Sequence, residues 1–164
     1  MAKMIRLPPK QSLRDELVGH LEGSLKTLER AHQASREAAT HEEAKPENDK
    51  DTRALEQSYV ARGQAIRIEE LRTNLAEVRT MPLHEFGEAQ PVGLGALVMV
   101  EEKDQRFLIF LAPHGGGTAL SGGTVQVVTP KSPLGRALLG KRTGDDCEAQ
   151  VGGRLRELSV LQVD

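Results

Sequence analysis

The stretch HEEAKPENDKD, residues 41–51, separates two long segments that both have a helical pattern. From Glu42 to Asp51 it holds five carboxylates and two lysines, a local charge of −3, whereas the whole chain has a formal charge of only −2. A proline inside a helix breaks it, so Pro46 marks a turn. The sequence therefore predicts an antiparallel α-helical coiled-coil hairpin over residues 1–80, with an acidic tip at residues 41–51.

Both arms of the predicted hairpin carry an apolar stripe near the base and smaller residues near the tip. Apolar side chains that recur every three or four residues form one face of a helix. These are Leu13, Leu17, Leu21, Leu25 and Leu28 in the first arm, and Ile68, Leu71, Leu75 and Val78 in the second. Toward the tip the stripe passes into alanines, among them Ala31 and Ala61. We expect Tyr59, close to Leu55, to pack into the same seam.

The composition changes after residues 81–92, MPLHEFGEAQPV, which have the proline, glycine and polar content of a linker. Apolar runs at residues 94–100 and 107–112, separated by a charged turn, predict a β-hairpin. Residues 113–123, PHGGGTALSGG, are expected to be a flexible glycine-rich excursion, and they lack the Gly-Lys-Ser/Thr ending of a phosphate cradle. A third strand is expected at residues 125–129.

A short helix is expected after the third strand. Ser132 and Pro133 are the residue types of an N-cap and of a first helical position, and Gly140 is suited to close the helix. Two further strands are expected on either side of the glycine turn at residues 152–153. The predicted fold class is therefore α+β, with residues 93–164 as a small β-sheet domain that contains one short helix.

Composition excludes several classes of function. The single cysteine, Cys147, excludes an internal disulfide framework and favours a reducing compartment, so we expect the cytoplasm. No apolar run is long enough for a membrane span. Lysines and arginines are dispersed among acids, which argues against strong direct binding of nucleic acid and favours a protein partner. We expect Cys147 to be a small core residue, and His41 and His114 to lie at the surface without binding a metal.

The run TPKSPLGRALLGK, residues 129–141, together with Gly144-Asp145 and the glycine turn, resembles the C-terminal domain of the bacterial Gre transcript cleavage factors. Glu47-Asn48 at the tip resembles the Glu-Asn pair of the same family, and the resemblance covers nearly the whole chain. It implies a C-terminal domain of FKBP-like fold without isomerase activity. It also implies a monomer that binds core RNA polymerase through the secondary channel of that enzyme.

The resemblance further implies that the tip carries carboxylates to the polymerase active site. Glu43, Glu47 and Asp49 would there help to hold a second Mg²⁺ and stimulate cleavage of backtracked RNA, because Mg²⁺ prefers hard oxygen ligands. The chain would then be no enzyme itself and would have no cofactor of its own. Gre cleavage factors have an aspartate three residues before the glutamate of the Glu-Asn pair, whereas this chain has Ala44 there. Glu43, Asp49 or Asp51 are the alternatives for the second ligand.

The partner-binding residues that the resemblance implies surround the short helix. They are Lys131, Ser132, Pro133, Arg136 and Lys141. The cations around this helix, Lys131, Arg136, Lys141 and Arg142, either form a docking patch or complement the dipole at the end of the helix. Two alternatives to a cleavage factor stay open, which are a regulator that occupies the channel without cleavage and a coiled-coil adaptor unrelated to transcription.

Overall fold

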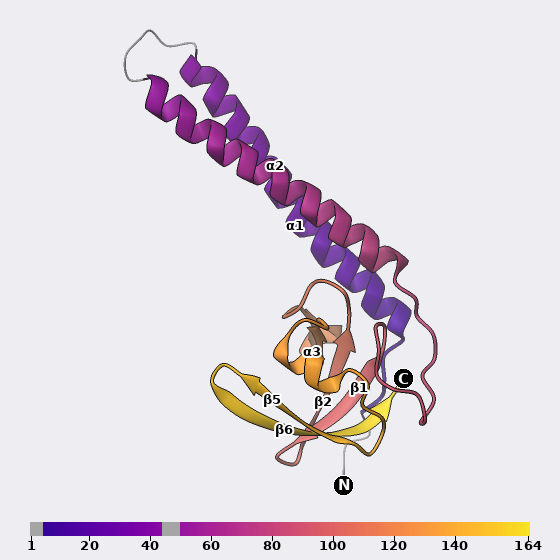
Figure 1. The fold of residues 1–164 in the computed structure, drawn as a ribbon. Coiled ribbons are helices and arrows are strands. Elements are labelled where there is room, and N and C mark those ends of the chain that lie inside the picture. The colour runs from indigo at the N-terminus through magenta and orange to yellow at the C-terminus, as the bar shows by residue number, and fades with distance from the viewer. Residues whose placement is uncertain (1–4, 44–49) are drawn as a thin grey trace. The chain divides into compact units, whose positions relative to one another are not determined.

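The computed structural model describes residues 5–43 and 50–164 (Figure 1). By the contacts between its residues, the chain divides into two compact units. One unit consists of Met1–Val18 and Glu77–Asp164, and the other is Gly19–Ala76. The start of the first long helix and the end of the second therefore belong to the same unit as the sheet. Among the helices described, none has a stretch that is long and apolar enough to cross a membrane.

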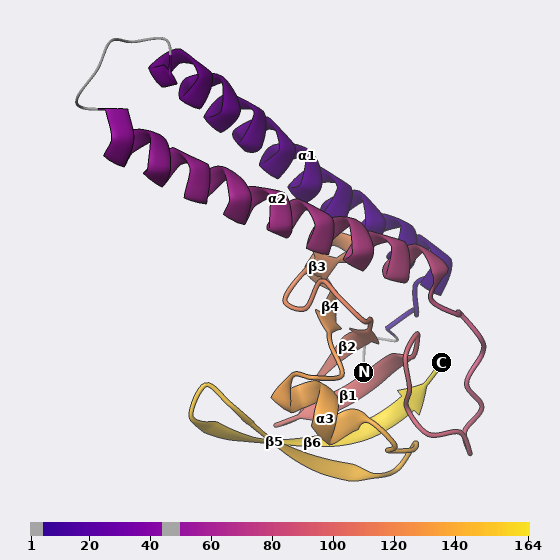
Figure 2. The ribbon, with the colours of Figure 1, turned by 45° about the horizontal axis from the view of Figure 1, so that its top comes forward.

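Two long helices, α1 (Lys10–Glu43) and α2 (Lys50–Thr80), run side by side in opposite directions (Figures 1 and 2). Arg72 Nη2 joins them by donating to Glu29 Oε1 at 2.9 Å. Prolines bound the pair, since Pro9 precedes α1 and Pro82 follows α2, and a proline disfavours helix at the residue before it. The predicted helical hairpin and the α+β fold class are confirmed.

The seam of the unit Gly19–Ala76 has a heptad spacing on both helices. The buried and half-buried seam positions are Leu21, Leu25, Leu28, His32, Ser35 and Ala39 on α1, and Gln57, Ala61, Gln64, Ile68, Leu71 and Leu75 on α2. Their spacing of three and four residues keeps one face of each helix toward the other. The prediction for Tyr59 is wrong, because the seam passes through its neighbours Gln57 and Ala61 and leaves Tyr59 64% exposed.

The second half of the chain forms one six-stranded mixed sheet with the strand order β3-β4-β2-β1-β6-β5. Only β2 and β4 pair in parallel, and the other neighbours are antiparallel. The strands are β1 (Leu97–Glu102), β2 (Gln105–Leu111), β3 (Ala119–Leu120), β4 (Val125–Val128), β5 (Asp146–Val151) and β6 (Arg154–Val163).

Two tight turns fix the register of the antiparallel pairs. Lys103 and Asp104, with φ of 49° and 62°, join β1 to β2, and Gly152 and Gly153, with φ of 59° and 76°, join β5 to β6. Two-residue loops with positive φ at both positions match the right-handed twist of the strands they join. The predicted charged turn after residue 100 is thus shorter than expected, because its two glutamates still belong to β1.

The short helix α3 (Pro133–Leu138) contacts β5 and helps to enclose the main hydrophobic core. The core is built from alternate residues of the strands together with the buried side of α3. Among its buried members are Val98, Val100, Ile109, Leu111, Leu134, Leu138, Cys147, Ala149, Leu158 and Val160. The prediction for Cys147 is confirmed, and burial raises the pKa of its thiol, so the reactive thiolate is disfavoured.

The segment between α2 and β1 has no regular secondary structure beyond a turn, but it is packed. Met81, Phe86 and Val92 are buried. Lys10 Nζ, at the start of α1, donates to the carbonyl oxygen of His84 at 2.5 Å and lies 5.2 Å from the centre of the Phe86 ring. Burial lowers the pKa of Lys10, and the carboxylates of Asp164 and Glu85 oppose that shift.

Contacts with both long helices anchor the glycine-rich residues 113–123. Glu16 of α1 accepts the backbone N–H of Ser121 with both carboxylate oxygens, at 2.9 and 3.2 Å. His114 pairs with Glu77 of α2. Gly115 has a φ of 86°, and a Cβ there would lie 2.6 Å from Leu17 Cδ1, so both conformation and space require glycine. The stretch also contains β3, which is too short to show any periodicity in the sequence.

Replacement of Gly135 by alanine should destabilise the sheet unit. A Cβ at Gly135 would lie 1.9 Å from the carbonyl oxygen of Thr129, and that backbone cannot move without displacing the N-cap of α3. We expect a loss of at least about 2 kcal/mol, at the upper end of overpacking costs. Differential scanning calorimetry of the full chain measures it.

The matched control is Gly63→Ala in α2, where a Cβ meets no atom within 4 Å. Alanine at an exposed helical position should stabilise the hairpin by about 0.5–1 kcal/mol, because it restricts the unfolded chain more than glycine does. Equal stability of Gly135→Ala and the parent chain would contradict the close approach at α3.

Candidate functional site

The predicted acidic site lies mostly outside the described residues. Glu47 and Asp49 fall in residues 44–49, and Asp51 and Glu43 belong to helix ends whose side chains are not described. The grouping of Glu43, Glu47 and Asp49 around a metal therefore stays a prediction. Within residues 5–43 and 50–164, no three His, Cys, Asp or Glu side chains are placed to hold a metal ion together.

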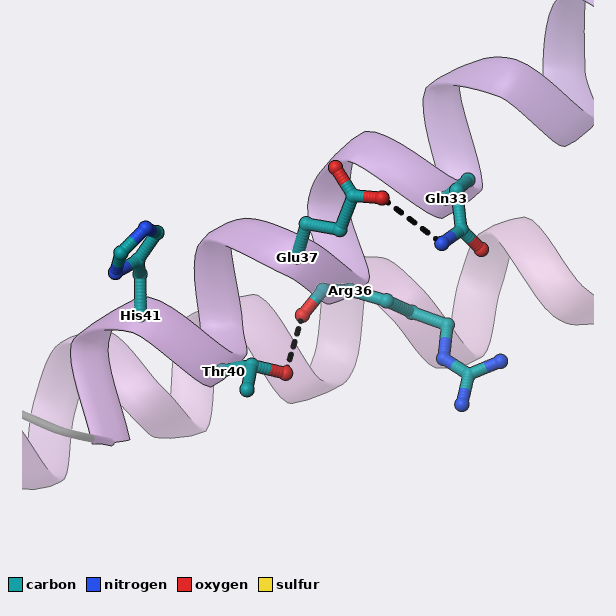
Figure 3. A pocket seen from close by; sticks show the side chains of 5 residues that line it. All are labelled: Gln33, Arg36, Glu37, Thr40 and His41. Atoms are coloured by element: carbon teal, nitrogen blue, oxygen red, sulfur yellow. Dashed lines mark hydrogen bonds between the residues drawn. The ribbon is translucent and has the colours of Figure 1, made fainter.

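The last described turns of α1 present a polar surface near the tip. Five side chains line a hollow there: Gln33, Arg36, Glu37, Thr40 and His41 (Figure 3). Gln33 Nε2 donates to Glu37 Oε1 at 3.0 Å, and Thr40 Oγ1 donates to the carbonyl oxygen of Arg36 at 2.9 Å. His41 is exposed, as predicted. All five come from one helix, so the hollow has no second wall that could position a substrate against acid and base groups.

The second candidate site is the segment around α3, and its geometry begins with Ser132. The Ser132 backbone is extended, at φ −70° and ψ 156°, and its hydroxyl accepts the N–H of Gly135 at 3.0 Å. The same hydroxyl donates to the carbonyl oxygen of Thr129 at 2.7 Å. Pro133 occupies the first turn, where its missing N–H costs no hydrogen bond. The predicted N-cap and first-turn proline are confirmed.

The end of α3 is fixed by backbone hydrogen bonds to the segment before β1. Gly140, with φ of 79°, donates its N–H to the carbonyl oxygen of Val92 at 3.0 Å. Val92 in turn donates to the carbonyl oxygen of Lys141 at 2.7 Å. A glycine with positive φ in the position after the C-cap residue, here Leu139, is a common end of a helix. The exposed residues of α3 therefore belong to a helix that is held at both ends.

The structure sorts the predicted partner-binding residues into two groups. Lys131, Pro133 and Arg136 are exposed and available to a partner, whereas Ser132 and Lys141 are half-buried. Ser132 is the helix cap, and the Lys141 ammonium lies close enough to Cys147 to act on its thiol electrostatically. The five residues are thus brought into one segment, but Ser132 contributes structure rather than surface.

One apolar residue of this surface was missed by sequence reasoning. Leu139, directly after α3, is 38% exposed, while Leu138 is fully buried. The signal was present in the pair Leu138-Leu139, because two adjacent residues of a helix cannot both face the same core. The α3 surface, defined as Lys131, Pro133, Arg136 and Leu139, therefore combines two cations with two apolar side chains.

The fold and these sites define a class of protein: a long helical hairpin joined to a small mixed-sheet domain with one capped helix. Residues 89–164 match the family described as transcription elongation factor, GreA/GreB, C-terminal. The sheet domain, including the α3 surface, is therefore similar to the C-terminal domain of GreA/GreB factors. No match is found among the curated proteins.

Solved structures of three other proteins are similar to the chain. The GreA factor homolog 1 (Gfh1) of Thermus thermophilus is 20% identical, with 90% of this chain and 94% of that chain covered and a TM-score of 0.40. Gfh1 of Thermus aquaticus is 21% identical, with 88% and 92% covered and a TM-score of 0.40. The transcription elongation factor GreA/GreB of Nitrosomonas europaea is 22% identical, with 57% and 77% covered and a TM-score of 0.36.

Ser132→Ala should loosen α3 by removing both hydrogen bonds of the hydroxyl. Loss of an N-cap costs about 1 kcal/mol. We expect faster hydrogen exchange at the Gly135 amide, which loses its acceptor, and lower stability toward urea. Ser132→Thr keeps a hydroxyl able to make both bonds and is the control. Unchanged protection of Gly135 in the alanine variant would show that the cap contributes nothing to the helix.

Proposed function

We propose that this protein is a transcription elongation factor that binds core RNA polymerase in the cytoplasm and extends its helical hairpin into the secondary channel. The observation that carries the proposal is the match of residues 89–164 to the GreA/GreB C-terminal family. The earlier resemblance at residues 129–141 lies inside this range and coincides with the α3 surface. The matched domain would therefore be the part that docks on the polymerase, and the protein would act as a monomer.

The α3 surface has the chemistry of a docking site for an acidic protein surface. Lys131 and Arg136 are exposed, and the helix that carries Arg136 is fixed by buried Leu134 and Leu138. Charges at the rim of an interface mainly speed association and select the partner, while apolar residues such as Leu139 add affinity when buried. Pro133 and the cap at Ser132 hold these groups in place before binding, which lowers the entropic cost of docking.

The acidic tip would supply the chemical effect. Glu43, Glu47 and Asp49 would add carboxylate ligands for a second Mg²⁺ in the polymerase active site, with Asp51 as the alternative to one of them. A second metal ion stabilises the attacking and leaving oxygens during hydrolysis of a phosphodiester. The polymerase would remain the enzyme, and this chain would stimulate its cleavage of backtracked RNA.

One observation favours a second candidate function. Ala44 stands where Gre cleavage factors have an aspartate, so one ligand of the tip is missing or displaced. A hairpin that enters the channel without completing the metal site would exclude other factors and would not stimulate cleavage. Both candidates share the docking step and differ only in what the tip does.

Binding of core RNA polymerase should depend on the α3 surface. Arg136→Glu places a like charge against the acidic surface that we expect on the partner, and it should raise the Kd at least tenfold, which corresponds to about 1.4 kcal/mol. A fluorescence titration of the labelled full chain measures the Kd. Arg154→Glu, at the exposed first residue of β6, is the control with the same change in charge. Failure of the parent chain to bind would favour the coiled-coil adaptor instead.

Stimulated cleavage should depend on Glu47. In stalled elongation complexes, Glu47→Ala should abolish the cleavage that the parent chain stimulates and leave its affinity for polymerase within about twofold, because the acid would act on the metal-bound transition state. Glu37→Ala, on the exposed face of α1, is the control. If the parent stimulates no cleavage across a magnesium titration but still competes with a cleavage factor for polymerase, the occluding function is correct.

A further inference from the structure

The outside of α2 carries a second heptad stripe, in addition to the one that lies in the seam. Its residues recur at intervals of three and four and are all exposed. We call them the outer α2 stripe: Thr52, Leu55, Tyr59, Arg62, Ile66, Glu69 and Thr73. Leu55, Tyr59 and Ile66 are 59%, 64% and 57% exposed. This spacing is the pattern by which one helix packs along another, and the seam with α1 lies on the opposite side of α2.

Rotation of α2 cannot bury the apolar residues of the outer α2 stripe in the seam. Ile68, Leu71 and Leu75 are buried there already. The helix runs without interruption from Lys50 to Thr80 and contains no proline, so it turns as one unit. Turning the outer α2 stripe inward would therefore expose those three buried residues. A surface outside the hairpin has to cover the stripe if its apolar residues are to be buried.

We propose that the outer α2 stripe joins two copies of this chain in an antiparallel dimer, with a two-fold axis between Val60 and Ala61. A two-fold interface uses the same patch on both copies, so the patch has to complement itself. The axis sets Leu55 opposite Ile66 of the second copy and so forms two apolar layers. Next to Ile66 lies a shallow, mainly apolar hollow that Ala65 also lines. Leu55 of the second copy would rest at the edge of this hollow, as a coiled-coil side chain inserts between residues of the facing helix.

The charged and aromatic positions of the stripe are also complementary in this pairing. The axis sets Tyr59 opposite Arg62 of the second copy, again in two symmetric layers. Arg62 makes no ion pair with any residue of the described ranges, so its guanidinium is free to stack on the tyrosine ring. A guanidinium over an aromatic face is attracted by the ring electrons. The outermost layers set Glu69 opposite the neutral side chain of Thr52.

The positions on either side of the central layers favour close approach of the two helices. They are Ser58 and Ala65 along one side of the stripe, and Glu56 and Gly63 along the other. Three of these four residues are small. The axis brings Ser58 beside Ala65 of the second copy and Glu56 beside Gly63, so no two like charges meet there.

Other pairings of the same stripe are less favourable. A parallel pairing sets Arg62 opposite Arg62 and Glu69 opposite Glu69 of the second copy, and like charges in direct opposition disfavour an interface. An antiparallel pairing shifted by one heptad toward Thr80 sets Tyr59 opposite Glu69 and Arg62 opposite Ile66. The guanidinium would then be covered by an apolar side chain without a partner for its charge.

The dimer would be a form of the free chain, so the inference does not rest on the proposed function. The monomer of the proposed function would form when the dimer dissociates. The layers extend from residue 52 to residue 69, which is about 27 Å of helix. An interface of one helix face is at the small end of specific contacts, so we expect a weak and reversible dimer.

Sedimentation velocity of the full chain at concentrations up to about 1 mM tests the dimer, because even weak association is populated there. A monomer–dimer equilibrium is expected. Leu55→Gln/Ile66→Gln should raise the dimer Kd at least tenfold, since it removes both apolar layers and keeps good helix formers. Val60→Gln is the matched control, because Val60 is 54% exposed but lies about a third of a turn from the stripe. It should change the Kd less than twofold.

Two results of this experiment would overturn the inference. One is a parent chain that stays monomeric at all concentrations, and the other is a double variant that dimerises as well as the parent. If the parent is monomeric and the double variant binds core RNA polymerase at least tenfold more weakly than the parent, the stripe is a polymerase contact instead.

Disulfide trapping tests the direction and register of the pair with substitutions that barely disturb the helix. A mixture of Leu55→Cys and Ile66→Cys chains should form cross-linked heterodimers on mild oxidation, whereas neither variant alone should cross-link. In the antiparallel pair the two copies of residue 55 lie about 16 Å apart along the axis, beyond the Cα separation of about 7 Å that a disulfide can span. Cys147 is buried and should not compete. Cross-linking of each variant with itself, or none in the mixture, would contradict the proposed pairing.

Tyr59 gives a direct optical readout, because it is the only tyrosine and the chain contains no tryptophan. Acrylamide should quench its fluorescence less strongly as the concentration of the parent chain rises, since the second copy covers the ring. In the Leu55→Gln/Ile66→Gln variant the quenching should stay constant over the same range. Quenching that does not change with concentration in the parent would show that Tyr59 remains exposed and that the inference is wrong.

Discussion

The rotation of α2 about its own axis, which sets the face that it turns toward α1, is the constraint on which much of the hairpin depends. Ile68, Leu71 and Leu75 are buried against the seam, and each such side chain contributes about 1.5–3 kcal/mol. The unpaired carbonyl atoms of Gln57 and Gln64 each cost about 1–3 kcal/mol. The free energy gained by burying three apolar side chains exceeds the cost of two unpaired polar atoms. The apolar part of α2 near Thr80 therefore determines how the whole helix is rotated about its axis. Because α2 is uninterrupted, its rotation about its axis is the same along its length. Leu55 and Tyr59 are therefore exposed, although burial in the seam would favour the opposite rotation.

The short helix α3 shows a different dependence on tertiary contacts. With six residues it is far too short to be stable alone, so its existence rests on buried Leu134 and Leu138, on the close approach at Gly135 and on the Ser132 cap. These are the same contacts that leave Lys131, Pro133 and Arg136 exposed. The same set of contacts therefore stabilises α3 and keeps the residues of the α3 surface exposed to solvent.

The proposed activity divides docking and chemistry between two parts of the chain. The α3 surface belongs to the unit that contains the sheet, whereas the predicted acids of the tip, within residues 43–51, belong to the other unit, Gly19–Ala76. A factor that completes the active site of another protein needs side chains that can reach that site and a domain that holds the complex together.

The sequence by itself determined the elements that have local signals. The apolar spacing predicted both arms of the hairpin, and Ser132-Pro133 predicted the start of α3, because spacing and capping act within a few residues. The predicted turn at Pro46 lies outside the described residues. The resemblance at residues 129–141 likewise pointed to the domain that the family match then covered. The arrangement of the tip acids stays a prediction.

Only the tertiary structure decided which of two compatible faces is buried and which distant residues meet. Tyr59 has the size and polarity to suit the seam, yet it is exposed because residues nine or more positions away fix the phase of α2. The two-residue strand β3 has no period, and its pairing with β4 depends on the sheet around it. Glu16 with Ser121 and Glu77 with His114 are separated by 105 and 37 residues, and no local pattern encodes such a contact. These features follow from tertiary packing, which depends on contacts between residues far apart in the sequence.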